Sequence, residues 1–161
     1  MKKILSVLSI AASLTWSLAS QAAGLTPQDH AEIQQLYARY NHAIDAGDAN
    51  AWADTFTADG VFNNNFKGRE GQLAFMKMWV EKMNGTQRRH WNSNLQVSGD
   101  GKTAKGSVYL MLWDISQKPA VVAGSGMYAD SLVKTKQGWR FTARVVNLDA
   151  PAAPAAQPAA K

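Results

Sequence analysis

Apolar residues recur at helical spacing in the first half of the chain. Between residues 33 and 44 the stripe consists of Ile33, Leu36, Tyr37, Tyr40 and Ile44. These offsets place the side chains on one face of an α-helix. Thr26 and Pro27 suit a helix start, and Gly47 suits a helix end. The pattern therefore predicts a first helix between these points.

Two further helices and a short strand follow before residue 86. Asp48 can cap a short second helix that carries Trp52 and Phe56, and Val61-Phe62 begins a strand. The segment 67–70 breaks that strand and leads into a third helix, which ends at Asn84-Gly85. The predicted inner face of this helix comprises Leu73, Met76, Trp79, Val80 and Met83.

From residue 88 onward the pattern alternates with a period of two. The alternation predicts strands at 88–98, 103–114, 120–135 and 139–148, with turns at 99–102 and 136–138. Helices first and an antiparallel meander afterwards indicate the α+β class. A strongly twisted sheet of this kind can curl around the helices and leave a cavity between them.

The two ends of the chain differ from this middle part. Residues 1–22 have two lysines and then an uncharged apolar run, which is typical of a cleavable signal peptide, with cleavage expected after Ala22 or Ala23. Residues 149–161 are rich in alanine and proline and are predicted to form a disordered tail. One domain is therefore expected over residues 25–148, in a soluble protein of the periplasm or the exterior.

Composition excludes several classes of partner and cofactor. Loss of Lys2 and Lys3 would lower the formal charge from +5 to +3, and the remaining basic residues are scattered, so no nucleic-acid partner is predicted. No later segment is long and apolar enough to enter a membrane. The chain has no cysteine, three histidines without His-x-x-x-His spacing, and no glycine-rich loop before a helix. We therefore expect no metal and no cofactor.

One predicted strand carries a polar row. His90, Asn92 and Asn94 alternate along it, so they should share one face, while Trp91 and Leu95 should share the other. The polar row could line a pocket, or it could face solvent while the apolar row faces the helices. Alternation alone leaves both orientations open.

Asp45 is the natural partner for an inward His90. It lies at the end of the first helix, where an acidic residue is slightly unfavourable, and this favours a specific role. A carboxylate that accepts from one imidazole nitrogen fixes the tautomer and leaves the other nitrogen to move a proton. The pair would then be an acid–base catalyst.

Three stretches of the domain carry a family resemblance. They are 40–62 with Tyr40-Asn41-His42 and Ala58-Asp59-Gly60, then 89–104 with Arg89-His90-Trp91-Asn92, then 126–146 with Gly126-Met127-Tyr128 and Gly138-Trp139-Arg140-Phe141. Together they resemble the SnoaL-like branch of the nuclear transport factor 2-like superfamily. The resemblance implies a cone-shaped α+β barrel, usually dimeric. That fold hosts isomerases, dehydratases, cyclases, hydrolases and binders without catalysis, so it does not choose between activities.

The resemblance also implies roles for individual residues. The position of His90 matches the acid–base histidine of scytalone dehydratase-like members, and Asp45 matches the aspartate that orients it. Tyr40 matches the oxyanion-hole tyrosine of ketosteroid isomerase, but Asn64 stands near the place of that enzyme's base. No histidine follows His90, whereas the dehydratases use a second one. Chemistry identical to either enzyme is therefore not expected.

Three functions remain open. The first is a lyase or isomerase that acts on a small apolar oxygenated molecule through Asp45, His90 and Tyr40. The second is a binding protein without catalysis whose hydrophobic cavity includes Trp52, Trp79, Asn92, Trp113 and Tyr128. The third is an interaction domain that docks a partner on its sheet. We also expect a homodimer, and a structural pair between Asp130 and Arg144 on adjacent strands.

Overall fold

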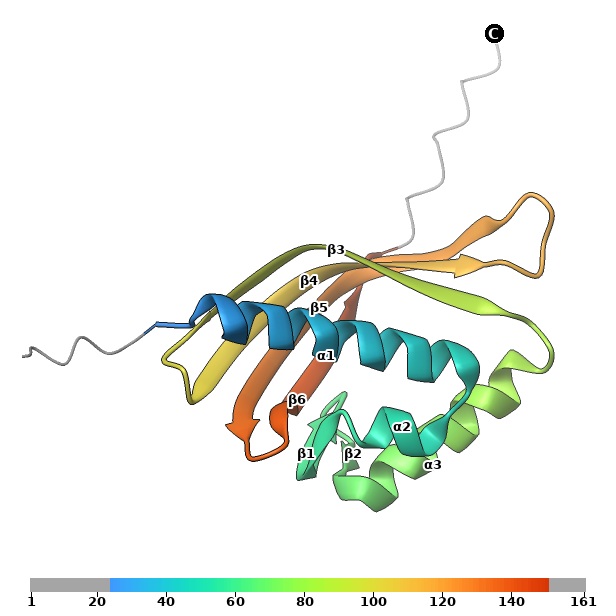
Figure 1. The fold of residues 1–161 in the computed structure, drawn as a ribbon. Helices are drawn as coiled ribbons and strands as arrows, with labels where there is room; N and C mark the ends of the chain where they lie inside the picture. The colour runs from blue at the N-terminus through green and yellow to red at the C-terminus, as the bar shows by residue number, and fades with distance from the viewer. Residues whose placement is uncertain (1–23, 151–161) are drawn as a thin grey trace, which may run out of the picture.

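A curved six-stranded sheet wraps around one long helix in the computed structural model, which describes residues 24–150 (Figure 1). The predicted signal peptide and almost all of the predicted Ala/Pro tail lie outside the described residues. The elements in chain order are α1 (Pro27–Ala46), α2 (Ala49–Ala53), β1 (Phe56–Phe62), β2 (Phe66–Lys67), α3 (Gly68–Met83), β3 (Arg88–Gly99), β4 (Thr103–Asp114), β5 (Val121–Thr135) and β6 (Gly138–Leu148).

The strand order is β2-β1-β6-β5-β4-β3. The pairs β3–β4, β4–β5 and β5–β6 form the predicted antiparallel meander, but β1 joins the last strand β6 in parallel. The α+β prediction and the cone-shaped arrangement are confirmed. The parallel pair closes the sheet beside α2 and α3.

Helix α1 begins and ends where its sequence signals predict. Thr26 and Asp29 form a reciprocal capping box, and Gly47 ends the helix in the left-handed conformation at φ 69°. The apolar stripe of α1 is buried against the concave face of the sheet, with Ile33, Leu36 and Tyr40 fully inaccessible. The helix therefore forms the centre of the core.

Two details of the helices differ from expectation. Phe56 does not continue the second helix, because α2 ends at Ala53 and Phe56 begins β1. The inner face of α3 contains Gln72, Phe75 and Met76, whereas Val80 is 47% exposed. Gln72 can be buried because its amide donates to the carbonyl of Gly60 at 3.1 Å.

Candidate active site

In β3, the strand that carries His90, the alternating set of residues that faces the core changes part-way along. His90 is buried and Asn92 half-buried, so both turn inward. This is the first of the two orientations that alternation left open, in which the polar row faces a pocket. Asn94 has a left-handed φ of 55° at a bulge between Ser93 and Gln96, and it is exposed. The extra residue reverses the alternation. Leu95 and Val97 consequently pack on the core, the side that His90 and Asn92 also face, whereas strict alternation would place the two pairs on opposite sides.

Asp45 and His90 form a hydrogen-bonded pair between the end of α1 and the start of β3. The imidazole Nδ1 lies 2.5 Å from Asp45 Oδ1, and the backbone N–H of His90 donates to both carboxylate oxygens at 3.1 and 3.2 Å. Because a carboxylate only accepts hydrogen bonds, the ring nitrogen facing it carries the hydrogen. Asp45 therefore holds both the backbone and the ring of His90, and Nε2 is left for a ligand.

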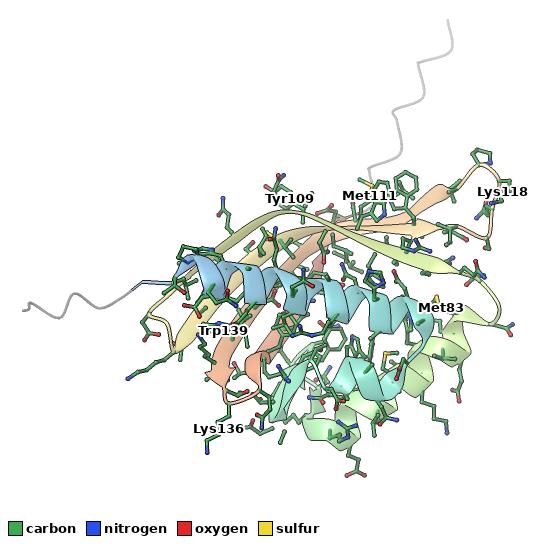
Figure 2. The ribbon with its side chains drawn as sticks, viewed as in Figure 1. Met83, Tyr109, Met111, Lys118, Lys136 and Trp139 are labelled. Carbon is green, nitrogen blue, oxygen red and sulfur yellow. The ribbon has the colours of Figure 1, made fainter. Side chains whose placement is uncertain are left out.

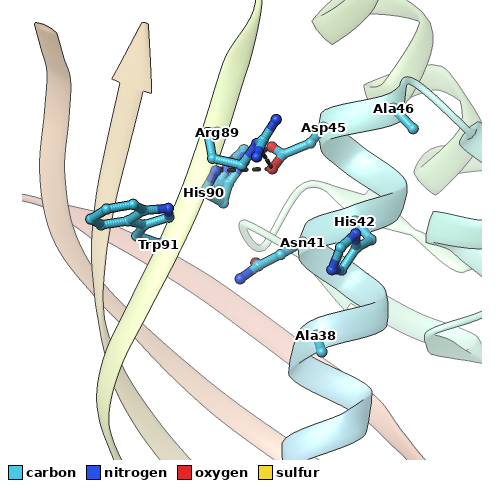
Figure 3. A pocket seen from close by; sticks show the side chains of 8 residues that line it. All are labelled: Ala38, Asn41, His42, Asp45, Ala46, Arg89, His90 and Trp91. Carbon is cyan, nitrogen blue, oxygen red and sulfur yellow. Dashed lines mark hydrogen bonds and ion pairs between the residues drawn. The ribbon is translucent and has the colours of Figure 1, made fainter. Parts of the chain in front are cut away.

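His90 lies in the wall between two hollows. One is a groove of about 590 Å³ between α1 and β3, lined also by Asn41, His42 and Asp45. Figure 3 shows this groove, with Arg89 reaching toward Asp45 and Trp91 turned away from α1. The Arg89 guanidinium is 3.7 Å from the Asp45 carboxylate and half exposed. Solvent therefore reaches the Asp45–His90 pair through this groove, on the side of Asp45.

The other hollow is a cavity of about 490 Å³ between α1, α3 and the concave face of the sheet, and it opens to solvent where the exposed Met78, Lys82 and Leu148 line it. This volume lies within the ~300–1,000 Å³ of small-molecule sites. Its wall is mainly apolar and aromatic, and it includes Ile44, Phe62, Phe75, Trp79, Leu110, Leu112 and Val146. The Trp79 ring lies 5.8 Å from the His90 ring. His90 is one of the few polar groups on this wall.

Two buried tyrosines also line the cavity. Tyr40 and Tyr128 are almost inaccessible, their ring centroids are 5.8 Å apart, and the Tyr40 hydroxyl has no partner among the described residues. Burial raises the pKa of Tyr40 to about 12, and it raises the pKa of Tyr128 as well. Both phenols therefore stay protonated at neutral pH. The Tyr40 hydroxyl is a buried donor without an acceptor, which a ligand oxygen could satisfy.

Residues 26–145 match the family described as SnoaL-like domain. The chain belongs to this family. An uncharacterized protein of Mycobacterium tuberculosis strain H37Rv is 31% identical over 128 residues, which cover 73% of this chain and 83% of that protein. Two solved structures from Streptomyces share the fold. Aln2 of a Streptomyces species is 28% identical with a TM-score of 0.71, covering 77% of this chain and 93% of that chain. ActVI-ORFA of Streptomyces coelicolor is 25% identical with a TM-score of 0.70, covering 78% and 98%.

The core of this SnoaL-like domain contains a fully buried ion pair behind the two tyrosines. Arg144 donates to both carboxylate oxygens of Asp130 at 2.8 Å, and the Tyr37 hydroxyl donates to the same carboxylate at 2.5 Å. The predicted cross-strand pair is thus confirmed. Burial disfavours the charge of Arg144, but the Asp130 carboxylate outweighs burial and raises the pKa of Arg144 above its usual value.

This ion pair also holds the rings of the site. The Arg144 guanidinium lies over the rings of Tyr37, Tyr40 and Tyr128 at 4.6, 4.2 and 4.1 Å. Gly106 leaves the space that Tyr37 occupies, since a Cβ there would lie 2.2 Å from the Tyr37 hydroxyl. The pair therefore positions Tyr40 and Tyr128 from behind.

Three residues predicted to bind ligand in the SnoaL-like domain are placed elsewhere. Trp52 is fully buried among aromatic side chains and does not line the cavity, because the short α2 turns it into the core. Trp113 lies on the other face of β4 from Leu112 and contacts Trp91, with ring centroids 5.6 Å apart. Asn92 accepts from Asn41 at 2.7 Å, so its side chain joins α1 to β3 and does not reach the cavity. Tyr128 lines the cavity as predicted.

The cavity also contains polar residues that the sequence reasoning missed. Lys82, Arg88 and Asn63 line it. The position of Arg88, two residues before His90 on the same strand, was a usable signal, because residues at this spacing share a face. Nothing in the local sequence marks Lys82 or Asn63.

Two further features bear on chemistry. Within residues 24–150, no group of three or more His, Cys, Asp or Glu side chains could hold a metal ion. In the same part of the chain, no helix combines the length and the apolar character needed to cross a bilayer. His30 and His42 are exposed, and His42 borders the outer groove.

Proposed function

We propose that this protein is an exported acid–base lyase or isomerase that acts on a small apolar molecule bearing oxygen. Membership of a small-molecule-binding family of isomerase type supports the general class. The observation that carries the proposal is the Asp45–His90 pair in the wall of an apolar cavity, with Nδ1 and Oδ1 2.5 Å apart.

The reaction follows from the groups that line the cavity. His90 Nε2 removes a proton from a carbon next to a carbonyl group, and the C–H electrons move into the carbonyl. The Tyr40 hydroxyl donates to the oxygen on which negative charge develops. His90 then returns its proton, either to another carbon of the substrate in an isomerisation or to a departing hydroxyl, which leaves as water. Asp45 stabilises the imidazolium in between.

A screen for turnover of small oxygenated compounds tests this mechanism. Once a substrate is found, His90→Ala should lower kcat by about 100-fold or more, the range of general acid–base catalysis. Asp45→Asn should also lower kcat, because the amide cannot stabilise the imidazolium as a carboxylate does. His42→Ala is the matched control, since this exposed histidine does not line the cavity. Undiminished turnover in His90→Ala would contradict the mechanism.

The alternative is a binding protein without catalysis. It is favoured by the largely apolar wall of the cavity, which can hold a hydrophobic ligand without any proton transfer. Tight binding of compounds that are recovered unchanged, with equal affinity in the wild type and in His90→Ala, would select this alternative.

We also propose that the protein is a homodimer through the outer face of its sheet. Trp91 pairs with Met111, and Tyr109 pairs with Met127, on the adjacent strands β3, β4 and β5. All four side chains are exposed. Figure 2 shows Tyr109 and Met111 pointing away from α1. A contiguous apolar patch of this kind is typical of a protein interface, and we name these four residues the outer patch.

A further inference from the structure

The charged side chains that line the cavity have one sign. Lys82 and Arg88 line it, while no Asp or Glu of the described residues does. The carboxylates near the site lie behind the wall, where Asp45 is bonded to His90 and Asp130 to Arg144. A ligand in the cavity therefore meets positive charge directly.

Arg88 is already neutralised. Its guanidinium lies 2.8 Å from the Asp114 carboxylate, and its side chain is 18% exposed. Hydrogen bonds from Ser116 and Gln117 lower the pKa of Asp114 to about 2, so the carboxylate is ionised at neutral pH. Arg88 is thus fixed in place, and its charge is balanced.

Lys82, an exposed residue at the opening of the cavity, supplies the unbalanced charge. It forms no ion pair or side-chain hydrogen bond within the part of the chain that the structure describes. It lies in the last turn of α3, where a cation also favours the helix end. That role alone would not require a place on the cavity wall. Met83, labelled in Figure 2, lines the cavity beside it.

The polar groups are divided between two parts of the cavity. Arg88 is at the first position of β3, and Lys82 is in the last turn of the helix before it, so both belong to the end where α3 meets the sheet. The register pairs Arg88 with the last residue of β4, Asp114. Tyr128 pairs with Val108, which comes six residues earlier in β4 and so lies at the inner end of the cavity. Tyr40 contacts Tyr128 at that inner end. His90 lies between, opposite Leu112.

We infer that the cavity accepts an aromatic carboxylic acid whose carboxylate lies at Lys82 and whose opposite end carries a hydroxyl or carbonyl oxygen for Tyr40. Phe62, Phe75 and Trp79 enclose its rings. This inference deepens the proposed function, because it names the substrate class of the same cavity. It depends on that function only for turnover, and binding tests it separately.

Isothermal titration calorimetry with the purified protein tests the inference. The probes are a naphthoate that carries a hydroxyl on the ring opposite its carboxylate, and the methyl ester of the same compound. The acid should bind at least about tenfold more tightly than the ester, as expected for one charge-assisted contact. The preference should weaken as the salt concentration rises. Equal binding of acid and ester would overturn the inference.

Two variants of α3 assign the preference to its residue. Lys82→Gln should lower the affinity for the acid about tenfold and leave that for the ester unchanged. Lys77→Gln, which removes an exposed charge from the same helix away from the cavity, should retain the full preference. A preference that survives Lys82→Gln, or that Lys77→Gln abolishes equally, would refute the role of Lys82.

Two further measurements separate ligand classes and separate this inference from the proposed function. Laurate that binds as tightly as the hydroxynaphthoate would refute the aromatic class. His90→Ala should keep the preference for the acid while it removes turnover. If no compound is turned over but the preference depends on Lys82, the inference stands and the catalytic proposal fails. If turnover depends on His90 but acid and ester bind alike, the catalytic proposal stands and the inference about the carboxylate fails.

Discussion

Replacement of Asp130 by Asn should destabilise the protein more than most single changes. The carboxylate is fully buried and is the counter-ion of the fully buried Arg144, which it contacts through two bonds of 2.8 Å. Asn keeps the shape but leaves the guanidinium uncompensated, a change that costs about 3–5 kcal/mol of unfolding free energy. The cation–π contacts of Arg144 persist in the variant, so we expect the lower half of that range.

Urea denaturation and thermal melting followed by circular dichroism measure this loss. A loss of that size corresponds to a fall in Tm of roughly 10–20 °C for a domain of this length. Tyr37→Phe is the milder control, because it removes one hydrogen bond to the same carboxylate and should cost about 1.5–3 kcal/mol. The double change Asp130→Leu with Arg144→Met should be more stable than Asp130→Asn. A loss below about 1 kcal/mol in Asp130→Asn would refute the assignment of a buried, uncompensated charge.

Three further predictions concern acid stability, export and assembly. The pKa of Asp114 is lower in the folded protein than in the unfolded chain, so its stabilising contribution is present above about pH 4 and is lost as the pH falls toward about 2. The free energy of unfolding should therefore depend less on pH across this window in Asp114→Asn than in the wild type. The control Asp59→Asn, at an exposed position, should keep the pH dependence of the wild type. Mass spectrometry of protein recovered outside the cytoplasm should find an N-terminus directly after Ala22 or Ala23, and a retained Met1 would contradict the signal peptide. Light scattering should find a dimer for the wild type and a monomer for Met111→Lys, whereas a wild-type monomer would refute assembly through the outer patch.

Most of the fold could be predicted because its signals are local. Capping residues, the apolar stripe of α1 and the turn residues between strands act over a few positions, and they placed the four long strands to within one residue of the observed bounds. The parallel pair β1–β6 could not be predicted from alternation. Its two strands are about 80 residues apart in the sequence, and no local pattern specifies such a partner.

The candidate site could be predicted only in part, because the side of the sheet that a residue faces is not set by local sequence alone. The inward turn of His90 needed the tertiary structure, since alternation left both faces open. The bulge at Asn94 then allows an inward polar pair and an inward apolar pair on the same strand, a result that strict alternation forbids. Trp113 was misplaced because an aromatic residue in a strand carries no sign of which face it occupies.

The late arrival of β6 has a consequence for biosynthesis. Strand β1 bonds to β6 along one edge and to the two-residue strand β2 along the other. Until residues 138–148 have left the ribosome, Phe56 and Phe62 have no long strand beside them, and the aromatic cluster around Trp52 lacks Phe141 as a cover. A nascent chain that stops short of Gly138 would therefore expose hydrophobic aromatic surface to chaperones and proteases. A C-terminally truncated protein should accordingly be degraded in the cell and should not accumulate as a smaller domain.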